Sequence, residues 1–270
     1  MLNKFAIKIF ILFFLLPVFA FPQEGKSIFQ IIGSDIKESV NDGIRVYSSP
    51  LHWKEKDGIT FGVLALTSAA AYLKDESVRA YFGKQHSDVN DKIMDAGKLY
   101  GNLVTPVIIG GGIYSAGLFA KNEDIRITGR MVFEAVLYSG LITTISKTVL
   151  GRARPYKERG SDYFKPFNID DGYVSMPSGH STVAFALSSV LANRIHNVYA
   201  SIGLYTIAGV TALSRIYHDQ HWASDVILGS AIGYFVGDFI SSGSNKNSQG
   251  VKHGLNIYPG IGTLNLRLSL

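Results

Sequence analysis

The sequence predicts an all-α protein, a bundle of helices to which a small C-terminal β-hairpin is added. Most of the 270 residues fall into apolar or amphipathic stretches of helical length, and a two-residue alternation marks the tail. The segment Gly151–Pro177 interrupts the helical pattern, because it is rich in charge and is punctuated by proline and glycine. We therefore expect a bundle in which this loop and the neighbouring helix ends meet at one end.

The start of the chain has the layout of a secretory signal peptide. Lys4 and Lys8 precede the apolar run Phe10–Phe19, which is short for a membrane span, and the small residue Ala20 follows. We expect residues 1–20 to form this signal, with cleavage near Ala20, so that the chain is exported. A retained anchor is the alternative.

Residues 21–100 form an N-terminal region of loops and helices. Residues 23–56 are polar and contain glycine and proline, so we expect short helices and loops there. Ile59–Leu73 is apolar but shorter than the ~20 residues that a spanning helix needs. Ser77–Tyr100 mixes charged and apolar residues in an amphipathic pattern, which predicts a helix.

Residues 101–242 are expected to form the helical core. Leu103–Ala120 carries no charge, and Met131–Leu150 is apolar except for Glu134 and Lys147. Three more helical runs follow the charged loop, namely His180–Ile195, Asn197–Ser214 and Ala223–Phe239.

In the tail, residues 243–270, apolar residues recur every second position instead of with the period of a helix. Its leucines alternate with polar residues, which is typical of a strand. The segment Leu255–Tyr258 could pair with this strand across the turn that begins at Pro259, giving a small hairpin. The alternating residues are Leu264, Leu266, Leu268 and Leu270.

Composition narrows the class of protein. Hydrophobic residues make up 47% of the chain and charged residues 17%, whereas soluble domains carry about 25% charged residues. These values exclude a disordered chain and leave a soluble helical protein and a membrane protein both open. Because the chain has no cysteine, disulfides, zinc-thiolate sites and cysteine nucleophiles are excluded.

The net charge of +5 fits a solvated surface or positive membrane loops as well as an anionic partner. Much of the positive charge lies near one segment, which favours a local anion site over an extended nucleic-acid surface. We therefore predict no nucleic-acid partner. The basic residues concerned are Lys147, Arg152, Arg154, Lys157, Arg159 and Lys165.

Three short segments at the ends of apolar helices carry the chemistry. In the third of them, Ser214–Asp225, His221 and Asp225 are four residues apart and would share one helix face. A carboxylate so placed orients an imidazole and stabilises the charge that develops on it. Arg215, just upstream, can present a permanent positive charge to an anion.

The other two segments add an anion seat and two cations. Ser178 and Gly179 would open a helix whose free backbone N–H groups can hold a phosphate, with His180 in its first turn. Lys147 and Arg154 are seven residues apart, and a lysine in an apolar run is costly unless it serves a polar site. Three cations and two histidines together indicate a phosphate-sized anion.

Together the three segments resemble the signature of a known family. Lys-x6-Arg-Pro, Pro-Ser-Gly-His and Ser-Arg-x5-His-x3-Asp occur in that order, from Lys147 to Asp225. This pattern resembles the tripartite signature of the type 2 phosphatidic acid phosphatase superfamily at every position and in spacing. The covered region runs from about 131 to 241, and no motif covers the N-terminal hundred residues or the tail.

The resemblance implies an all-α phosphatase that acts on a phosphate monoester or pyrophosphate of a lipid. It implies that His221 attacks phosphorus and forms a phosphohistidine, that Asp225 orients His221, and that His180 protonates the leaving oxygen. No metal and no other cofactor is implied, since cations hold the phosphoryl oxygens. The implied phosphate-binding residues are Lys147, Arg154, Ser178, Gly179 and Arg215.

The resemblance also implies a membrane protein of the inner membrane with its site on the exterior, or periplasmic, side. An exported N-terminus then requires an even number of crossings before Gly151, which Leu103–Ala120 and Met131–Leu150 provide if Ile59–Leu73 does not cross. A soluble periplasmic acid phosphatase, a vanadium-dependent haloperoxidase and a non-catalytic membrane protein are the alternatives. Nothing in the sequence indicates an oligomeric state.

Overall fold

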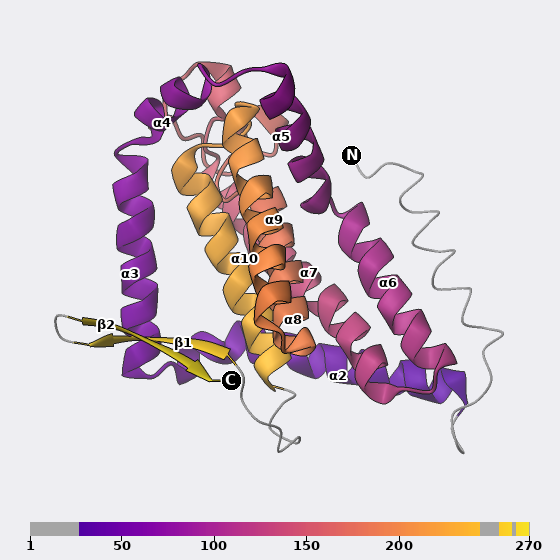
Figure 1. The fold of residues 1–270 in the computed structure, drawn as a ribbon. Coiled ribbons are helices and arrows are strands. Elements are labelled where there is room, and N and C mark those ends of the chain that lie inside the picture. Colours follow the sequence, from indigo (N-terminus) through magenta and orange to yellow (C-terminus); the bar gives the residue numbers. More distant parts are fainter. Residues whose placement is uncertain (1–26, 244–253, 261–262, 270) are drawn as a thin grey trace.

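A computed structural model describes residues 27–243, 254–260 and 263–269, and its fold confirms the predicted all-α class (Figure 1). The short 3-10 helices η2 (Ser49–His52), η3 (Pro155–Lys157) and η4 (Asp171–Tyr173) lie between the longer ones. The helices are α2 (Ile28–Ser48), α3 (Glu55–Tyr72), α4 (Asp75–Phe82), α5 (Asp88–Tyr100), α6 (Val104–Phe119), α7 (Glu123–Leu150), α8 (Gly179–Ile195), α9 (Val198–Tyr217) and α10 (Ala223–Gly243).

Helix α8 forms the centre of the bundle and packs against α7, α9 and α10. Its contact with α10 is very close, because a Cβ added at Gly233 would lie 2.2 Å from the carbonyl oxygen of Thr182. The main apolar core fills the space between α7, α8 and α10, and burial of such side chains is the principal stabilising term. This core includes Met131, Val132, Ala135, Leu187, Val190, Val236 and Ile240.

The N-terminal region departs from the expectation of short helices and loops. Residues 28–48 form one long helix, α2, which begins with a capping box between Ser27 and Gln30. The glycine at 43 does not break this helix, because it lies against the ring of Tyr138 in α7, where a Cβ would be 2.9 Å from the ring. The prediction was wrong because this contact is made with a distant segment.

The single helix predicted over 77–100 is also wrong. The chain forms α4 and α5 instead, with a break after Gly83, and Ser87 caps the start of α5 through its hydroxyl group. The amphipathic pattern continues through the break because both helices bury one side against α9.

Helix α3 changes the expected path of the chain. It extends the short apolar run to 18 residues and lies along α10 (Figure 1). The chain therefore passes from one end of the bundle to the other three times before the charged loop, along α3, along α5 with α6, and along α7. Only the last two of these passes were expected.

The tail contains the expected hairpin. Strands β1 (Gly254–Gly260) and β2 (Thr263–Ser269) pair antiparallel, with Leu255 opposite Leu268 and Pro259 opposite Leu264. The predicted signal segment, residues 1–20, lies outside the described residues.

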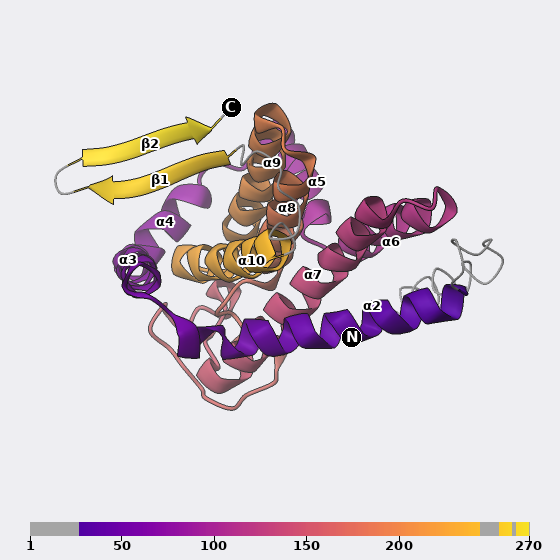
Figure 2. The ribbon, with the colours of Figure 1, turned by 90° about the horizontal axis from the view of Figure 1, so that it is seen from below.

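Seen from below, α2 lies across one side of the bundle (Figure 2). It is at the end where α6 joins α7, whereas the charged loop joins α7 to α8 at the opposite end. The C-terminal ends of α7 and α9 and the N-terminal ends of α8 and α10 therefore meet beside this loop, as the sequence predicts.

Candidate active site

The charged loop begins with a sharp turn at Gly151. This residue ends α7 in the left-handed conformation (φ 61°), and a Cβ at this position would lie 1.7 Å from the carbonyl oxygen of Lys165. Only glycine fits such a turn. The turn leads into a bridge between Arg152 and Phe164, so the loop folds back on itself and directs Arg152 and Arg154 inward.

Two cations of the first motif approach the site from α7 and from the loop. The Nζ atom of Lys147 donates to the carbonyl oxygen of Val174. Arg154 is held by three hydrogen bonds, from Nε to the carbonyl of Asp171, from Nη2 to Oδ1 of Asp171 and from Nη1 to Oε1 of Gln220, at 2.8, 2.8 and 2.9 Å. Hydrogen bonds to the loop and to Gln220 thus hold both side chains in place.

The second motif forms the start of α8, as predicted. Ser178 is the N-cap residue and is fully buried, but its hydroxyl does not cap the helix and instead accepts from the hydroxyl of Ser181 at 3.0 Å. Gly179 lies near Lys147, since a Cβ at Gly179 would be 3.8 Å from its Cε. The positive end of the α8 dipole therefore faces the same space as this lysine. His180 lies in the first turn.

The third cation, Arg215, comes from the last turn of α9. It is 7% exposed, and within the described part of the chain its buried Nε has no hydrogen-bond partner. Arg215 lies close enough to Arg154, and Lys147 close enough to both, for their charges to repel one another. An anion placed between these three cations would remove that repulsion.

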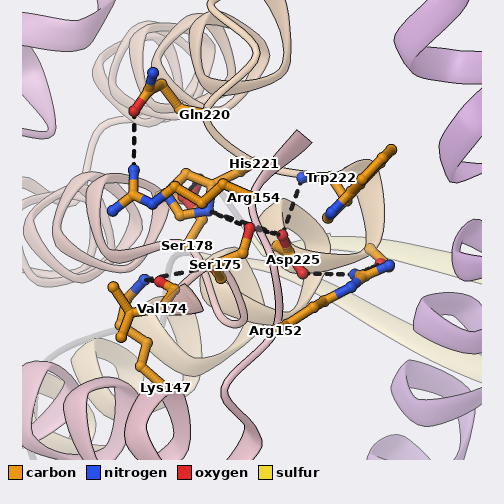
Figure 3. A network of polar contacts seen from close by, with 12 residues as sticks. Lys147, Arg152, Arg154, Val174, Ser175, Ser178, Gln220, His221, Trp222 and Asp225 are labelled. Atoms are coloured by element: carbon orange, nitrogen blue, oxygen red, sulfur yellow. Dashed lines mark hydrogen bonds and ion pairs between the residues drawn. The ribbon is translucent and has the colours of Figure 1, made fainter. Parts of the chain in front are cut away.

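His221 and Asp225 meet in the buried interior of the site (Figure 3). Nδ1 of His221 lies 3.8 Å from Oδ2 of Asp225 and 3.5 Å from the hydroxyl of Ser175, which itself donates to Oδ2 at 2.6 Å. The expectation that both lie on one helix is wrong, because α10 begins at Ala223 and His221 precedes it. His221 lies in the turn before α10, and the backbone N–H of Trp222 closes this turn by donating to Oδ2 of Asp225 at 2.9 Å.

The environment of His221 keeps its ring neutral. Burial is the main cause that lowers the pKa of His221 well below its usual value, and the charges of Lys147 and Arg154 act in the same direction. Asp225 opposes this shift. Since Nδ1 faces Ser175 and Asp225, a proton on Nδ1 leaves the lone pair of Nε2 available to react.

Not all of the clustered basic residues serve the site. Lys157, Arg159 and Lys165 lie on the exposed surface of the loop. Arg152 is fully buried, and it binds Asp225 and Asp75 rather than facing the space between the three cations.

Sequence reasoning missed the residues that surround Asp225. Ser175 and Arg152 lie within the charged loop, where nothing local distinguishes them from their neighbours. Asp75 lies in α4, far from the motifs in the chain, and no sequence signal connects it to them. A fully buried arginine requires buried carboxylates, but burial of Arg152 is known only from the fold.

The site can thus hold a compact anion and attack it. Three cations and a helix N-terminus supply positive charge, and a neutral, oriented imidazole supplies a nucleophile. His180 supplies a second imidazole, and burial, followed by the charges of Arg215, Lys147 and Arg154, lowers its pKa to about 4.

Comparison with known proteins shows what this region is similar to. Residues 129–249 match the family model described as the PAP2 superfamily. The lipid A 1-phosphatase of Rhizobium etli is 33% identical over 110 residues, which are 39% of this chain and 45% of that protein. The lipid A 1-phosphatase of Porphyromonas gingivalis is 42% identical over 66 residues, 24% of this chain and 15% of that protein. The aligned part of the chain spans less than half the length of these curated relatives.

A solved structure shows the same fold. The transmembrane PAP2-type phosphatidylglycerolphosphate phosphatase of Bacillus subtilis superposes with a TM-score of 0.54 at 22% identity, over 70% of this chain and 96% of that chain.

Proposed function

Because residues 129–249 form a PAP2 superfamily domain, we propose that the protein is a phosphatase that hydrolyses a lipid phosphate. The observation that carries this proposal is that Lys147, Arg154 and Arg215 lie close to one another, with Lys147 and Arg154 also close to the buried His221. Positive charge without a bound anion is costly at a buried site, so the arrangement favours occupation by a phosphoryl group.

In the first step Nε2 of His221 attacks phosphorus, and the bond from phosphorus to the lipid oxygen breaks. The electron pair leaves with that oxygen, and His180 protonates it to give the free alcohol. The dianionic substrate, placed beside His180, favours the protonated ring that this step needs. The product on the enzyme is a phosphohistidine, whose positive charge Asp225 stabilises.

In the second step His180 takes a proton from water, and the hydroxide so formed attacks phosphorus. The bond between nitrogen and phosphorus breaks, and inorganic phosphate leaves. Lys147, Arg154 and Arg215 hold the phosphoryl oxygens in both steps, with Ser178 and the N–H of Gly179, and they supply the charge neutralisation that a metal supplies elsewhere.

The exposed surface supports a position within a membrane. On α7, large apolar side chains recur every four residues on the exposed face, although the opposite face is already buried in the core. An apolar stripe that stays exposed on a helix whose other face is already buried favours contact with lipid. The exposed residues of this stripe are Leu137, Leu141, Ile145 and Val149.

Helix α2 shows the same feature in stronger form. Asp35 and Ser39 face the protein, where Asp35 binds Arg126 and Ser39 binds Glu134, both in α7. Large apolar side chains of α2 face outward, beside the exposed Lys37, Glu38 and Arg45. The outward residues include Phe29, Ile36, Val40 and Ile44, each more than half exposed.

Within the described residues, helix length and apolarity point to specific spans. The stretch Ala223–Ser242 of α10 is long and apolar enough to cross a bilayer, and half of it is buried in the bundle. Asp88–Tyr100 and Val104–Phe119 meet the same condition together, as a pair bent by 51°. The expected span Met131–Leu150 does not meet this condition.

We further propose that the site faces the exterior. The opposite end of the bundle carries Lys121, Arg126, Arg130 and Arg194, as a cytoplasmic end does, whereas several basic residues at the site end, Lys147, Arg152 and Arg154 among them, serve the site or its buried carboxylates. With three passes before the charged loop, an exterior site places α2 on the cytoplasmic side. Cleavage of an exported signal near Ala20 and an exterior site are therefore incompatible if all three passes cross the membrane.

The relatives indicate the substrate class. Since two of them are named lipid A 1-phosphatases, a phosphorylated glycolipid is the first substrate to test, beside phosphatidic acid and a polyprenyl pyrophosphate.

The test is phosphate release by the purified protein from these lipids and from a water-soluble phosphate monoester. The wild type is compared with His221→Asn and His180→Asn. With substrate labelled in the phosphate, the wild type should trap an acid-labile, base-stable phosphoenzyme, and His221→Asn should trap none. Full activity of His221→Asn would overturn the proposal.

A further inference from the structure

Arg152 lies behind the candidate nucleophile, on the far side of Asp225 from His221 (Figure 3). Its side chain is fully buried, and each of its five N–H groups has an acceptor. Nη1 donates to Oδ1 of Asp225 and to the hydroxyl of Ser224, both at 2.7 Å. Nη2 donates to Oδ2 of Asp75 at 2.8 Å, and Nη2 and Nε both donate to the carbonyl of Ser161.

Because all of its N–H groups already have acceptors, Arg152 differs in role from the cations that face the anion-binding space. A guanidinium group with no free N–H and no exposed surface cannot contact a phosphoryl oxygen. Arg215, by contrast, retains a buried Nε without a partner among the residues that the structure describes. Arg152 must therefore act on the reaction, if at all, through Asp225.

Asp75 completes the arrangement from α4. It is 1% exposed, and its Oδ1 accepts from the backbone N–H of Ser224 at 2.9 Å while Oδ2 accepts from the hydroxyl of Ser224 at 2.6 Å. It thus fixes the first turn of α10, the turn that carries Asp225. One guanidinium group is shared between two buried carboxylates.

The charges of this group do not cancel. With His221 neutral, Asp75, Arg152 and Asp225 together carry one net negative charge in a buried volume. When phosphorylation makes the ring of His221 positively charged, the net charge of that ring and the three groups becomes zero. Such a site stabilises the charged intermediate relative to the resting enzyme, which is the condition for catalysis.

We propose that Arg152 and Asp75 are positioning residues, which hold Asp225 against His221 and leave one negative charge to stabilise the phosphohistidine. This inference rests on the proposed phosphohistidine mechanism. Arg152 fixes the direction of the Asp225 carboxylate, and Asp75 prevents the guanidinium group from neutralising it.

Other charged groups also act on His221. Lys147 at the end of α7 and Arg154 in the charged loop both disfavour a positive ring, and Asp225 at the start of α10 favours it. Removing the charge of Asp75 leaves Arg152 to neutralise Asp225, so the ring of His221 should become harder to protonate.

The test is Asp75→Asn, in which the amide oxygen can still accept from Ser224. We expect kcat to fall about tenfold with KM changed less than about twofold, because Asp75 does not touch the phosphate. The acid limb of the plot of kcat/KM against pH should move to lower pH. The matched control is Asp35→Asn, another buried carboxylate bound to an arginine, at the opposite end of the bundle. It should change stability without moving the pH profile.

Arg152→Gln leaves two buried carboxylates unpaired, so failure to fold is its expected outcome. The double variant Asp75→Asn with Arg152→Gln removes one charge of each sign. It therefore tests the role of Arg152 without leaving two buried carboxylates unpaired. It should fold and should lose kcat rather than raise KM.

A pH profile of Asp75→Asn that superposes on that of the wild type, with kcat unchanged, overturns the inference. This result is distinct from failure of the proposed function, which would appear as a wild type without phosphatase activity or as an active His221→Asn enzyme.

Discussion

Nδ1 of His221 lies 3.8 Å from Oδ2 of Asp225, with the hydroxyl of Ser175 in contact with both. The carboxylate is thus tied to the ring partly through a serine that no motif contains. Both ends of the arrangement are buried, so its geometry does not depend on solvent.

Ser175→Ala should lower kcat about tenfold, because it removes the hydroxyl that donates to Asp225 and contacts the ring. KM should change little, since Ser175 does not face the anion space. Ser139→Ala serves as control, because Ser139 is an equally buried serine whose hydroxyl binds a carbonyl within α7. Equal kcat values for the two variants would show that the hydroxyl of Ser175 contributes to packing and not to the reaction.

Arg215→Gln should reduce kcat/KM by about a hundredfold to a thousandfold, since a donor to the developing phosphoryl charge is lost. The matched control is Arg159→Gln, which removes an equal charge from the exposed surface of the loop. Initial rates of phosphate release at matched ionic strength provide the measurement. A comparable loss in both variants would indicate that net charge, rather than the site, attracts the substrate.

Stability should fall as the pH is lowered through the ordinary histidine range. In the unfolded chain a histidine binds a proton near pH 6.5, whereas the pKa of folded, buried His221 is well below that value. Below pH 6.5 the unfolded state therefore binds a proton that the folded state does not bind. The free energy of unfolding should drop by at most about 1.4 kcal/mol per pH unit for this residue.

The measurement is the thermal unfolding midpoint in detergent at pH 7.5 and pH 5.5. His221→Asn lacks this titration, so its midpoint should fall less than that of the wild type. A larger fall in the variant would mean that His221 gains a proton on folding, contrary to its burial.

Cysteine labelling can establish the orientation cleanly, because the chain has no cysteine of its own. Arg159→Cys on the charged loop should react with a membrane-impermeant maleimide in spheroplasts. Lys121→Cys, at the opposite end of the bundle, should react only after permeabilisation. The reverse pattern would place the site in the cytoplasm, and labelling of both without permeabilisation would contradict a spanning bundle.

Removal of metal ions should leave the activity unchanged. Lys147, Arg154 and Arg215 already supply positive charge to the phosphoryl oxygens, so no cation needs to be added. Phosphate release is measured after dialysis against EDTA, with and without added Mg²⁺. Loss of activity that Mg²⁺ restores would show that the three side chains do not suffice.

Much of the bundle could be predicted because each of these helices is a continuous run of residues with a helical or apolar pattern of its own. The runs that became α6, α8, α9 and α10 are apolar over a helical length, and their predicted ends agree with the structure within a few residues. Helix α2 was missed because its glycine at 43 reads as a break until it is packed against Tyr138. The gap between α4 and α5 was missed because both helices continue one amphipathic pattern.

The sequence by itself determined the helical class and the order and spacing of three motifs, whose residues the fold gathers at one end of the bundle. It determined these because helical periodicity and motif spacing are properties of neighbouring residues. Only the tertiary structure decided which basic residues face the anion-binding space and which one is buried and bound by carboxylates. Lys157, Arg159 and Lys165 stay exposed, while Arg152 is saturated by Asp225 and by Asp75. The role of a charge depends on its burial and its partners, and Asp75 becomes a partner only when α4 packs beside α10.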